Sequence, residues 1–173
     1  MNYSGNERFF DRDELIVSKT DLKGRITYAN DVFLRLADLT EEEVLGAPHS
    51  IIRHENMPRA VFHLLWQTIA AGSEIFAYVV NKSKNGDYYW VLAHVTPSYS
   101  NGKIVGYHST RRSPNPDIIH DSIEPLYDQL LAVEASHKNR KEGMQESFAA
   151  VVSLLNDKGV SYDEFASTLM RNE

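Results

Sequence analysis

Two Asn-Gly dipeptides, at 85–86 and 101–102, divide residues 74–111 into three runs rich in apolar residues. Asn-Gly is the strongest local signal for a two-residue hairpin turn, because both central residues of a type I′ turn need a positive φ. Residues 74–111 therefore predict three consecutive antiparallel strands. Such a meander must bury at least one face of its sheet, which restricts the chain to folds that contain a packed antiparallel sheet.

The first turn also predicts which side chains share a face. Counting back from a two-residue turn places Asn81 opposite Trp90 and Ala77 opposite His94. The face with Asn81, Trp90 and His94 mixes polar and apolar groups, as binding cavities do, so we expect it to line a cavity. The other face is almost wholly apolar and is expected to meet the terminal segments or a second subunit. A slip of one residue at a turn would exchange the faces. The third strand adds Tyr107, Ser109 and Arg111.

The chain before the meander predicts a hairpin followed by helices. Residues 15–20 and 25–29 are predicted strands around a turn. Asn30 or Asp31 can cap a short helix, and Thr40 with Glu43 forms the capping box of another. After Pro58, apolar residues at helical spacing predict a longer helix ending at Gly72, which we expect to close the cavity. These apolar residues are Phe62, Leu65, Trp66 and Ile69.

Polar groups concentrate in the segment 46–58, between two prolines that prevent one continuous helix. Short irregular segments of this kind can line a pocket, with apolar residues anchoring the loop while polar tips face a bound group. A surface loop with a capping histidine is the equal alternative. The polar residues are His49, Arg53, His54 and Asn56.

Beyond the meander, the stretch 113–116 with two prolines predicts a boundary. Apolar residues at 119, 123, 126, 130 and 133 predict a packing helix that Pro125 could kink. A second, smaller amphipathic helix is predicted over residues 148–155. The chain thus divides into an N-terminal cap (1–13), a central α+β domain (14–113) and a C-terminal helical extension (114–173).

Composition excludes several classes of function. Cysteine is absent, which excludes disulfides, thiolate metal sites and flavin–cysteinyl photochemistry. Lys+Arg 18 against Asp+Glu 24 gives a net charge of −6 with no basic run, which argues against binding to nucleic acid or to anionic membranes. Neither an apolar run of about 20 residues nor a signal-peptide pattern is present. A cytoplasmic protein is expected.

Several ordered motifs resemble the PAS domains of bacterial aerotaxis receptors, over roughly residues 12–114. The motifs are Tyr28-Ala29-Asn30, Leu45-Gly46-Ala47-Pro48-His49, Ile52-Arg53-His54, Met57-Pro58, Phe62, Trp66, Lys84-Asn85-Gly86-Asp87-Tyr88-Tyr89-Trp90-Val91, Val95-Thr96-Pro97, Gly106-Tyr107 and Arg111. The resemblance implies a PAS sensor domain: a five-stranded antiparallel sheet with short helices and one long helix on one face. The helices after residue 113 would be an extension of this fold.

The resemblance also implies a non-covalent FAD site used to sense redox or oxygen status. The flavin-supporting positions of the family fall on Asn30, Arg53, His54, Phe62 and Asn81. Arg53 and His54 could donate to the pyrophosphate, and Asn81 could meet the polar edge of the isoalloxazine.

Four further residues complete the candidate site: Asn56, Trp66, Trp90 and His94. The two tryptophans could wall the ring, and His94 with Asn81 could respond to its reduction. Two departures from the family are Glu55-Asn56, where a Pro-Asp pair is usual, and Ile75, where tryptophan is usual.

The expected function is therefore a sensory module, not an enzyme, that signals to a separate chemoreceptor or signalling protein. A homodimer is also expected. One alternative is a heme b gas sensor with His49, His54, His63 or His94 as axial ligand. Another is a cofactor-free docking module. An enzyme with a His54–Glu55 or His94–Tyr107 acid–base pair is disfavoured, because the sequence has no nucleophile elbow, phosphate loop or cluster with metal-ligand spacing.

Overall fold

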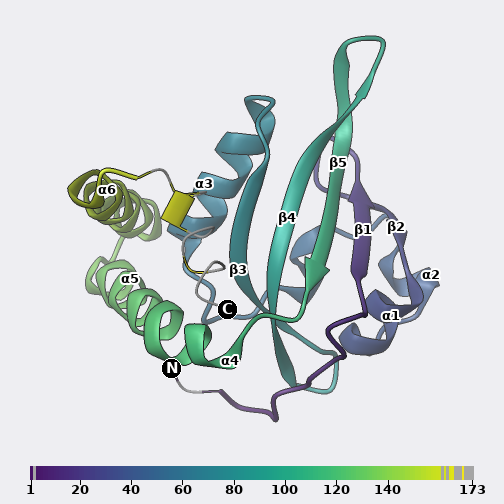
Figure 1. The fold of residues 1–173 in the computed structure, drawn as a ribbon, viewed down its shortest axis with the longest axis horizontal. Helices are drawn as coiled ribbons and strands as arrows, with labels where there is room; N and C mark the ends of the chain where they lie inside the picture. The colour runs from purple at the N-terminus through teal and green to yellow at the C-terminus, as the bar shows by residue number, and fades with distance from the viewer. Residues whose placement is uncertain (2, 161, 163, 166–168, 170–173) are drawn as a thin grey trace.

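The computed structural model describes residues 1, 3–160, 162, 164, 165 and 169. A five-stranded antiparallel sheet lies at its centre, with strand order β2-β1-β5-β4-β3 (Figure 1). This confirms the expected α+β fold. The strands are β1 (Ile16–Thr20), β2 (Ile26–Ala29), β3 (Ile75–Lys82), β4 (Tyr88–Ser100) and β5 (Lys103–Arg112).

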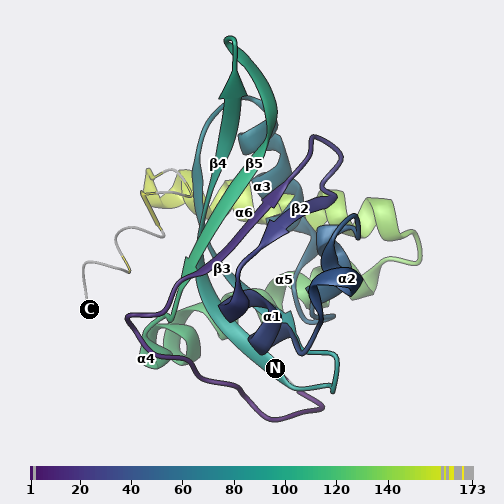
Figure 2. The same ribbon diagram turned by 90° about the vertical axis from the view of Figure 1, so that its right-hand side faces the viewer.

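The second Asn-Gly turn forms as predicted. Asn101 and Gly102 have φ values of 49° and 73°, and Ser100 pairs with Lys103 across the turn. Positive φ at both central positions is the requirement of a type I′ turn. The hairpin of β4 and β5 that it closes extends beyond the other strands (Figure 2).

The first Asn-Gly turn differs from the prediction. Only Gly86 has a positive φ there, and the Ser83 amide donates to the carbonyl oxygen of Asp87 at 2.7 Å. The loop therefore holds three residues, 84–86, with its last residue left-handed, as in a type I turn followed by a bulge. A tertiary contact favours this form, because the Ser83 hydroxyl donates to the carbonyl oxygen of Leu36 at 2.6 Å.

The longer loop shifts the register of β3 against β4 by one residue. Asn81 pairs with Tyr89, and Val80 pairs with Trp90, so the predicted pairing is wrong. Because side chains alternate along a strand, a shift of one residue exchanges the faces of one strand relative to the other. Trp90 therefore lies on the opposite face from Asn81.

Short helices and one longer helix cover one face of the sheet, as predicted. They are α1 (Asp31–Ala37), α2 (Glu41–Val44), the 3₁₀ helix η1 (His49–Ile52) and α3 (Arg59–Ala70). The Asn30 side chain accepts from the Phe33 amide and caps α1. Both bonds of the predicted capping box between Thr40 and Glu43 are present.

The C-terminal extension folds as α4 (Pro116–Ile118), the π-helix η2 (Ile119–Ile123), α5 (Glu124–Ser136) and α6 (Arg140–Lys158). Helix α5 covers the edge strand β3, where the Tyr127 hydroxyl donates to the carbonyl oxygen of Tyr78 at 2.5 Å. Helix α6 packs on α5 and α3 (Figure 1). We call α5 and α6 the C-terminal hairpin.

Helix α6 begins eight residues before the predicted start at 148. Its polar first half showed no apolar periodicity, but tertiary contacts hold it. The Asn139 side chain caps the helix, and Ser147 is buried with its hydroxyl donating to the carbonyl oxygen of Leu130. Residues 161, 163, 166–168 and 170–173 of the predicted extension lie outside the described residues, and its boundary at 113/114 stays a prediction.

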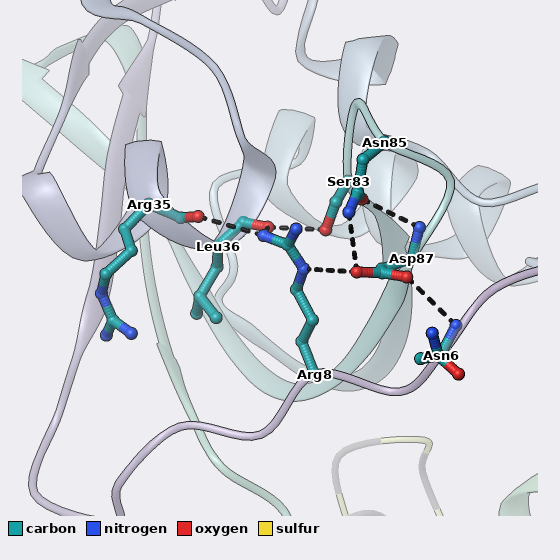
Figure 3. A network of polar contacts seen from close by, with 7 residues as sticks. All are labelled: Asn6, Arg8, Arg35, Leu36, Ser83, Asn85 and Asp87. Carbon is teal, nitrogen blue, oxygen red and sulfur yellow. Dashed lines mark hydrogen bonds and ion pairs between the residues drawn. The ribbon is translucent and has the colours of Figure 1, made fainter.

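The N-terminal residues run along the turn between β3 and β4. The Arg8 guanidinium bonds to the Asp87 carboxylate at 3.0 Å and donates to the carbonyl oxygens of Arg35 and Leu36 at the end of α1 (Figure 3). The Asn6 amide donates to the same Asp87 carboxylate. One arginine thus joins the N-terminal segment, the β3–β4 turn and α1. Of the described helices, none is long and apolar enough to cross a membrane.

Candidate functional site

A cavity lies between the sheet and α3. Its volume is about 60 Å³, several times the space that one water needs. A larger planar group would fit only if the wall opened. Its lining residues are Ser18, Thr20, His49, Arg53, Phe62, Leu65, Trp66, Ile69, Val79, Asn81, Ala93, Val95, Tyr107, Ser109 and Arg111.

Arg111 supplies an uncompensated positive charge to this cavity. Its side chain is buried, and its Nη2 donates to the Ser18 hydroxyl at 2.8 Å and to His49 Nε2 at 2.6 Å. No carboxylate of the described residues forms an ion pair with it. Burial lowers the pKa of Arg111 to about 10, so the group is still charged at neutral pH. A buried charge without a counter-ion is costly, which indicates a site for an acceptor-rich or anionic ligand.

His49 is the neutral partner of this arginine. Burial, together with the charge of Arg111, lowers the pKa of His49 to about 3. Because guanidinium nitrogens only donate, His49 Nε2 must accept, and the ring proton then resides on Nδ1. The Ser18 hydroxyl lies 3.1 Å from the same Nε2. Ser18, His49 and Arg111 therefore form one polar cluster in the lining of the cavity.

Four buried polar atoms of the cavity lining have no hydrogen-bond partner among the described residues. They are Thr20 Oγ1, Asn81 Nδ2, Ser109 Oγ and Arg111 Nη1. Buried polar groups are nearly always paired, so a cluster of unpaired ones is expected where a ligand or ordered water completes the bonds. Two of the four atoms can only donate, and the two hydroxyls can do either. The missing partner must therefore present several acceptors.

Aromatic side chains form the apolar wall. The Arg53 guanidinium lies 4.4 Å from the centroid of the Phe62 ring, and its Nη2 donates to the carbonyl oxygen of Met57. Trp66 meets Tyr107 edge to face at 5.5 Å between centroids. Trp66 is 36% exposed, so this part of the wall borders solvent.

Of the nine predicted site residues, four line the cavity: Arg53, Phe62, Trp66 and Asn81. Their role as cofactor contacts stays a prediction.

Three other predicted site residues, Asn30, His54 and Asn56, do not line the cavity. Asn30 uses its side chain to cap α1 and to bond the backbone of Val17 and Leu15. His54 is buried near Tyr3, outside the cavity, and its Nδ1 accepts from the Asn56 amide.

Trp90 and His94 do not line the cavity, which corrects the prediction that they share its face with Asn81. The cause is the one-residue shift at the three-residue turn. Trp90 instead meets Tyr127 of α5 at 5.9 Å between ring centroids. His94 stacks on Phe76 at 4.2 Å and bonds to a carboxylate on the outer face.

The predicted FAD contacts did not include Ser18, Thr20 or His49, although His49 was a candidate in the segment 46–58 and for the heme alternative. A signal for the first two existed, because they alternate with apolar residues along β1 and share the inward face of buried Ile16. Two polar residues at inward positions of a strand indicate either a polar core or a ligand. The approach of Arg111 to His49 depends on tertiary structure and left no local signal.

Comparison with known proteins identifies the family. Residues 26–111 match the family model described as the PAS fold. They form a PAS domain. The chain is similar to the aerotaxis receptor of Escherichia coli, with 40% identity over 129 residues, which cover 75% of this chain and 25% of the receptor. It thus spans about a quarter of that relative.

Two further matches are more distant. The nitrogen fixation regulatory protein of Klebsiella pneumoniae is 27% identical over 81 residues, which cover 47% of this chain and 16% of that protein. A structure of the blue-light photoreceptor Aureochrome1 LOV domain superposes with a TM-score of 0.56 at 23% identity. The superposed region covers 64% of this chain and 89% of the Aureochrome1 chain. At this identity the structural likeness shows the fold alone.

Proposed function

We propose that this PAS domain binds FAD non-covalently in the cavity and reports redox or oxygen status to a separate chemotaxis-type signalling protein in the cytoplasm. The unpaired donors around the cavity, with the buried charge of Arg111 among them, are the observation that carries the proposal. Similarity to the aerotaxis receptor of Escherichia coli also supports this proposal.

The donor set fits the polar edge of an isoalloxazine ring. That edge carries two carbonyl oxygens and ring nitrogens that accept hydrogen bonds, which matches Asn81 Nδ2 and Arg111 Nη1. The apolar lining from Leu65, Ile69 and Val79 would exclude water from the ring. A bound flavin would supply a redox change that alters charge and hydrogen-bond demand at these donors.

The heme alternative finds less support in the geometry. Of the four histidines predicted as axial ligands, His49 alone lines the cavity, and the Arg111 guanidinium lies against its Nε2. A metal at that nitrogen would have to displace a cation. His63 faces Phe148 of α6, and His94 lies on the outer face.

The enzyme alternative loses one of its two acid–base pairs. Tyr107 lines the cavity, whereas His94 lies on the opposite face of the sheet, so the two cannot act on one substrate. The described residues hold no group of three histidine or acidic side chains suited to a metal ion.

Helix α3 offers a route for the signal. One side of it carries Phe62 and Trp66 to the cavity, and another side contacts α6, where the rings of His63 and Phe148 lie 5.1 Å apart. A change at the cavity wall would move a helix on which the C-terminal hairpin packs. We infer that this hairpin is the element that a partner reads, with a second copy of the chain as one candidate partner.

The test is the visible spectrum of the purified protein, followed by release of the chromophore on heating and its identification by chromatography. The expected result is a flavin spectrum and released FAD. Asn81→Ala and Arg53→Ala should lower the flavin content at least severalfold. Arg112→Ala, an exposed neighbour on β5, is the matched control and should leave it unchanged.

A Soret band would replace the FAD proposal with the heme alternative. A protein that takes up neither added FAD nor added heme would leave only the docking role. Full flavin content in both site variants would refute the assignment of the cavity.

A further inference from the structure

A second hollow lies beside the cavity, between the N-terminal end of α3 and the C-terminal hairpin. It is an open cleft with a volume of about 480 Å³. Arg53 lines both the cavity and this cleft, so the two hollows adjoin at that side chain. The cleft residues are Ser50, Arg53, His54, Glu55, Met57, Arg59, Lys82, Leu131, Glu134, Ala135 and Arg140.

Positive charge gathers in the cleft, although the chain as a whole carries −6. Arg53 follows η1, Arg59 opens α3, Lys82 ends β3 and Arg140 opens α6, so four separate elements each bring one cation. Only Glu55 and Glu134 oppose them there. Burial lowers the pKa of Arg53, the charge of Glu134 opposes this shift, and the charges of Arg59 and Arg140 lower the pKa further. Converging like charges are unfavourable unless an anion joins them.

The N-terminal end of α3 adds a further feature that attracts anions. The Ala60 amide in its first turn faces the cleft, because it donates to Glu134 Oε1 at 3.1 Å. Free amides and the helix dipole make such an end attractive to anions. In the structure a carboxylate from α5 holds this position. An incoming phosphate group would be attracted by Arg59 and Arg140 and repelled by Glu134.

We propose that this cleft binds the diphosphate of a flavin dinucleotide whose ring occupies the cavity, and that Arg140 makes the C-terminal hairpin one wall of that site. This rests on the proposed function. Because Arg140 and Glu134 both belong to the hairpin, binding of the diphosphate and docking of the hairpin are coupled. Coupling between two equilibria is reciprocal, so whatever loosens the hairpin also weakens the dinucleotide.

Charge-neutral variants measured with three flavins test this proposal. Wild type should bind FAD more tightly than FMN, and FMN more tightly than riboflavin, as followed by quenching of tryptophan fluorescence. Arg140→Gln should weaken FAD about three- to tenfold, the range of one partly exposed charge–phosphate contact. Glu134→Gln should strengthen FAD by a similar factor, because it removes repulsion. Neither should change the affinity for riboflavin, which has no phosphate.

Two exposed residues of α6 outside the cleft, changed as Lys141→Gln and Glu146→Gln, are matched controls and should shift no affinity. Hydrogen exchange supplies an independent readout: FAD should protect the amides of α6 more than riboflavin does. Equal shifts for FAD and riboflavin in a variant would mean a purely structural role and overturn the proposal. Equal affinities of wild type for the three flavins would also overturn the proposal, although flavin binding itself would stand. Binding of no flavin at all would instead refute the proposed function.

Discussion

Replacing Arg111 with methionine should stabilise the ligand-free protein and weaken its binding of flavin. The guanidinium is buried beside the cavity and pairs with Ser18 and His49, both uncharged. Methionine is similarly long and flexible, so it can fill the space without a charge. Buried charges replaced by well-packed apolar groups often leave a protein equally or more stable.

The magnitude follows from two opposing terms. The lowering of the Arg111 pKa from 12.5 to about 10 by burial corresponds to about 3 kcal/mol of unfavourable transfer. Methionine removes this cost but loses the bonds to Ser18 and His49, together about 1–2 kcal/mol. The Ser18 hydroxyl, 3.1 Å from His49 Nε2, can then donate to it, so neither is stranded. The net gain is about 1–2 kcal/mol, or a rise of about 2–8 °C in Tm for a chain of this size.

Urea unfolding and thermal unfolding of flavin-free protein measure the first effect, with absence of visible absorbance as the criterion for removal of flavin. Binding of added FAD measures the second, and we expect at least a tenfold loss of affinity. Arg112→Met on the exposed side of the same strand is the matched control and should change both quantities little.

A flavin-free Arg111→Met protein that is less stable than wild type by about 1 kcal/mol or more would contradict the reasoning. It would mean that the guanidinium holds the sheet to η1 more strongly than its burial costs. Unchanged FAD affinity would separately show that Arg111 does not meet the ligand.

Three further predictions concern stability. The pKa of His49 falls from 6.5 to about 3 on folding, so the unfolded chain binds the extra proton and stability should fall by about 1.4 kcal/mol per pH unit below 6.5. Between pH 7 and pH 5, wild type should lose about 2 kcal/mol more than His49→Gln in urea unfolding, and equal losses would contradict the burial of a neutral ring. Gly143→Ala should lower the free energy of unfolding by about 1–3 kcal/mol, because a Cβ there would lie 2.6 Å from the carbonyl oxygen of Glu134. This loss should exceed the gain from the higher helix propensity of alanine. A variant that is more stable in thermal unfolding would mean that α6 does not pack so closely on α5. Tyr127→Phe should cost about 1–3 kcal/mol by leaving the Tyr78 carbonyl at the β3 edge without that donor, and an unchanged urea midpoint would argue against this contact.

Local patterns predicted the elements that depend on neighbouring residues. The capping box at Thr40, the helix after Pro58 and the type I′ turn at Asn101 all formed as predicted. Each rests on backbone preferences or on apolar spacing within a few residues, which a sequence displays directly. The family resemblance covered the same stretch and implied the sheet as a whole.

Predictions failed where a distant residue decided the outcome. The Asn85-Gly86 turn gained one residue, with Ser83 bonded to the end of α1, and the faces of Trp90 and His94 changed with it. The polar first half of α6 became helix because it packs on α5 and α3. The free energies of a two-residue and a three-residue turn, or of a loop and a helix, differ locally by about 1 kcal/mol. One tertiary hydrogen bond can reverse such a preference.

Turn chemistry, capping and apolar spacing act over a few residues, so the amino-acid order by itself determined most of the strands, helices and turns. Its motifs carried the resemblance to PAS domains. The tertiary structure decided the face on which Trp90 and His94 lie, and it added Ser18, Thr20 and His49 to the cavity wall. It brought Arg111 of the last strand against His49 of a short helix, and Arg140 of the extension beside Arg53. The members of each pair are about 60 to 90 positions apart in the sequence, and only the packing of the whole chain brings them near one another.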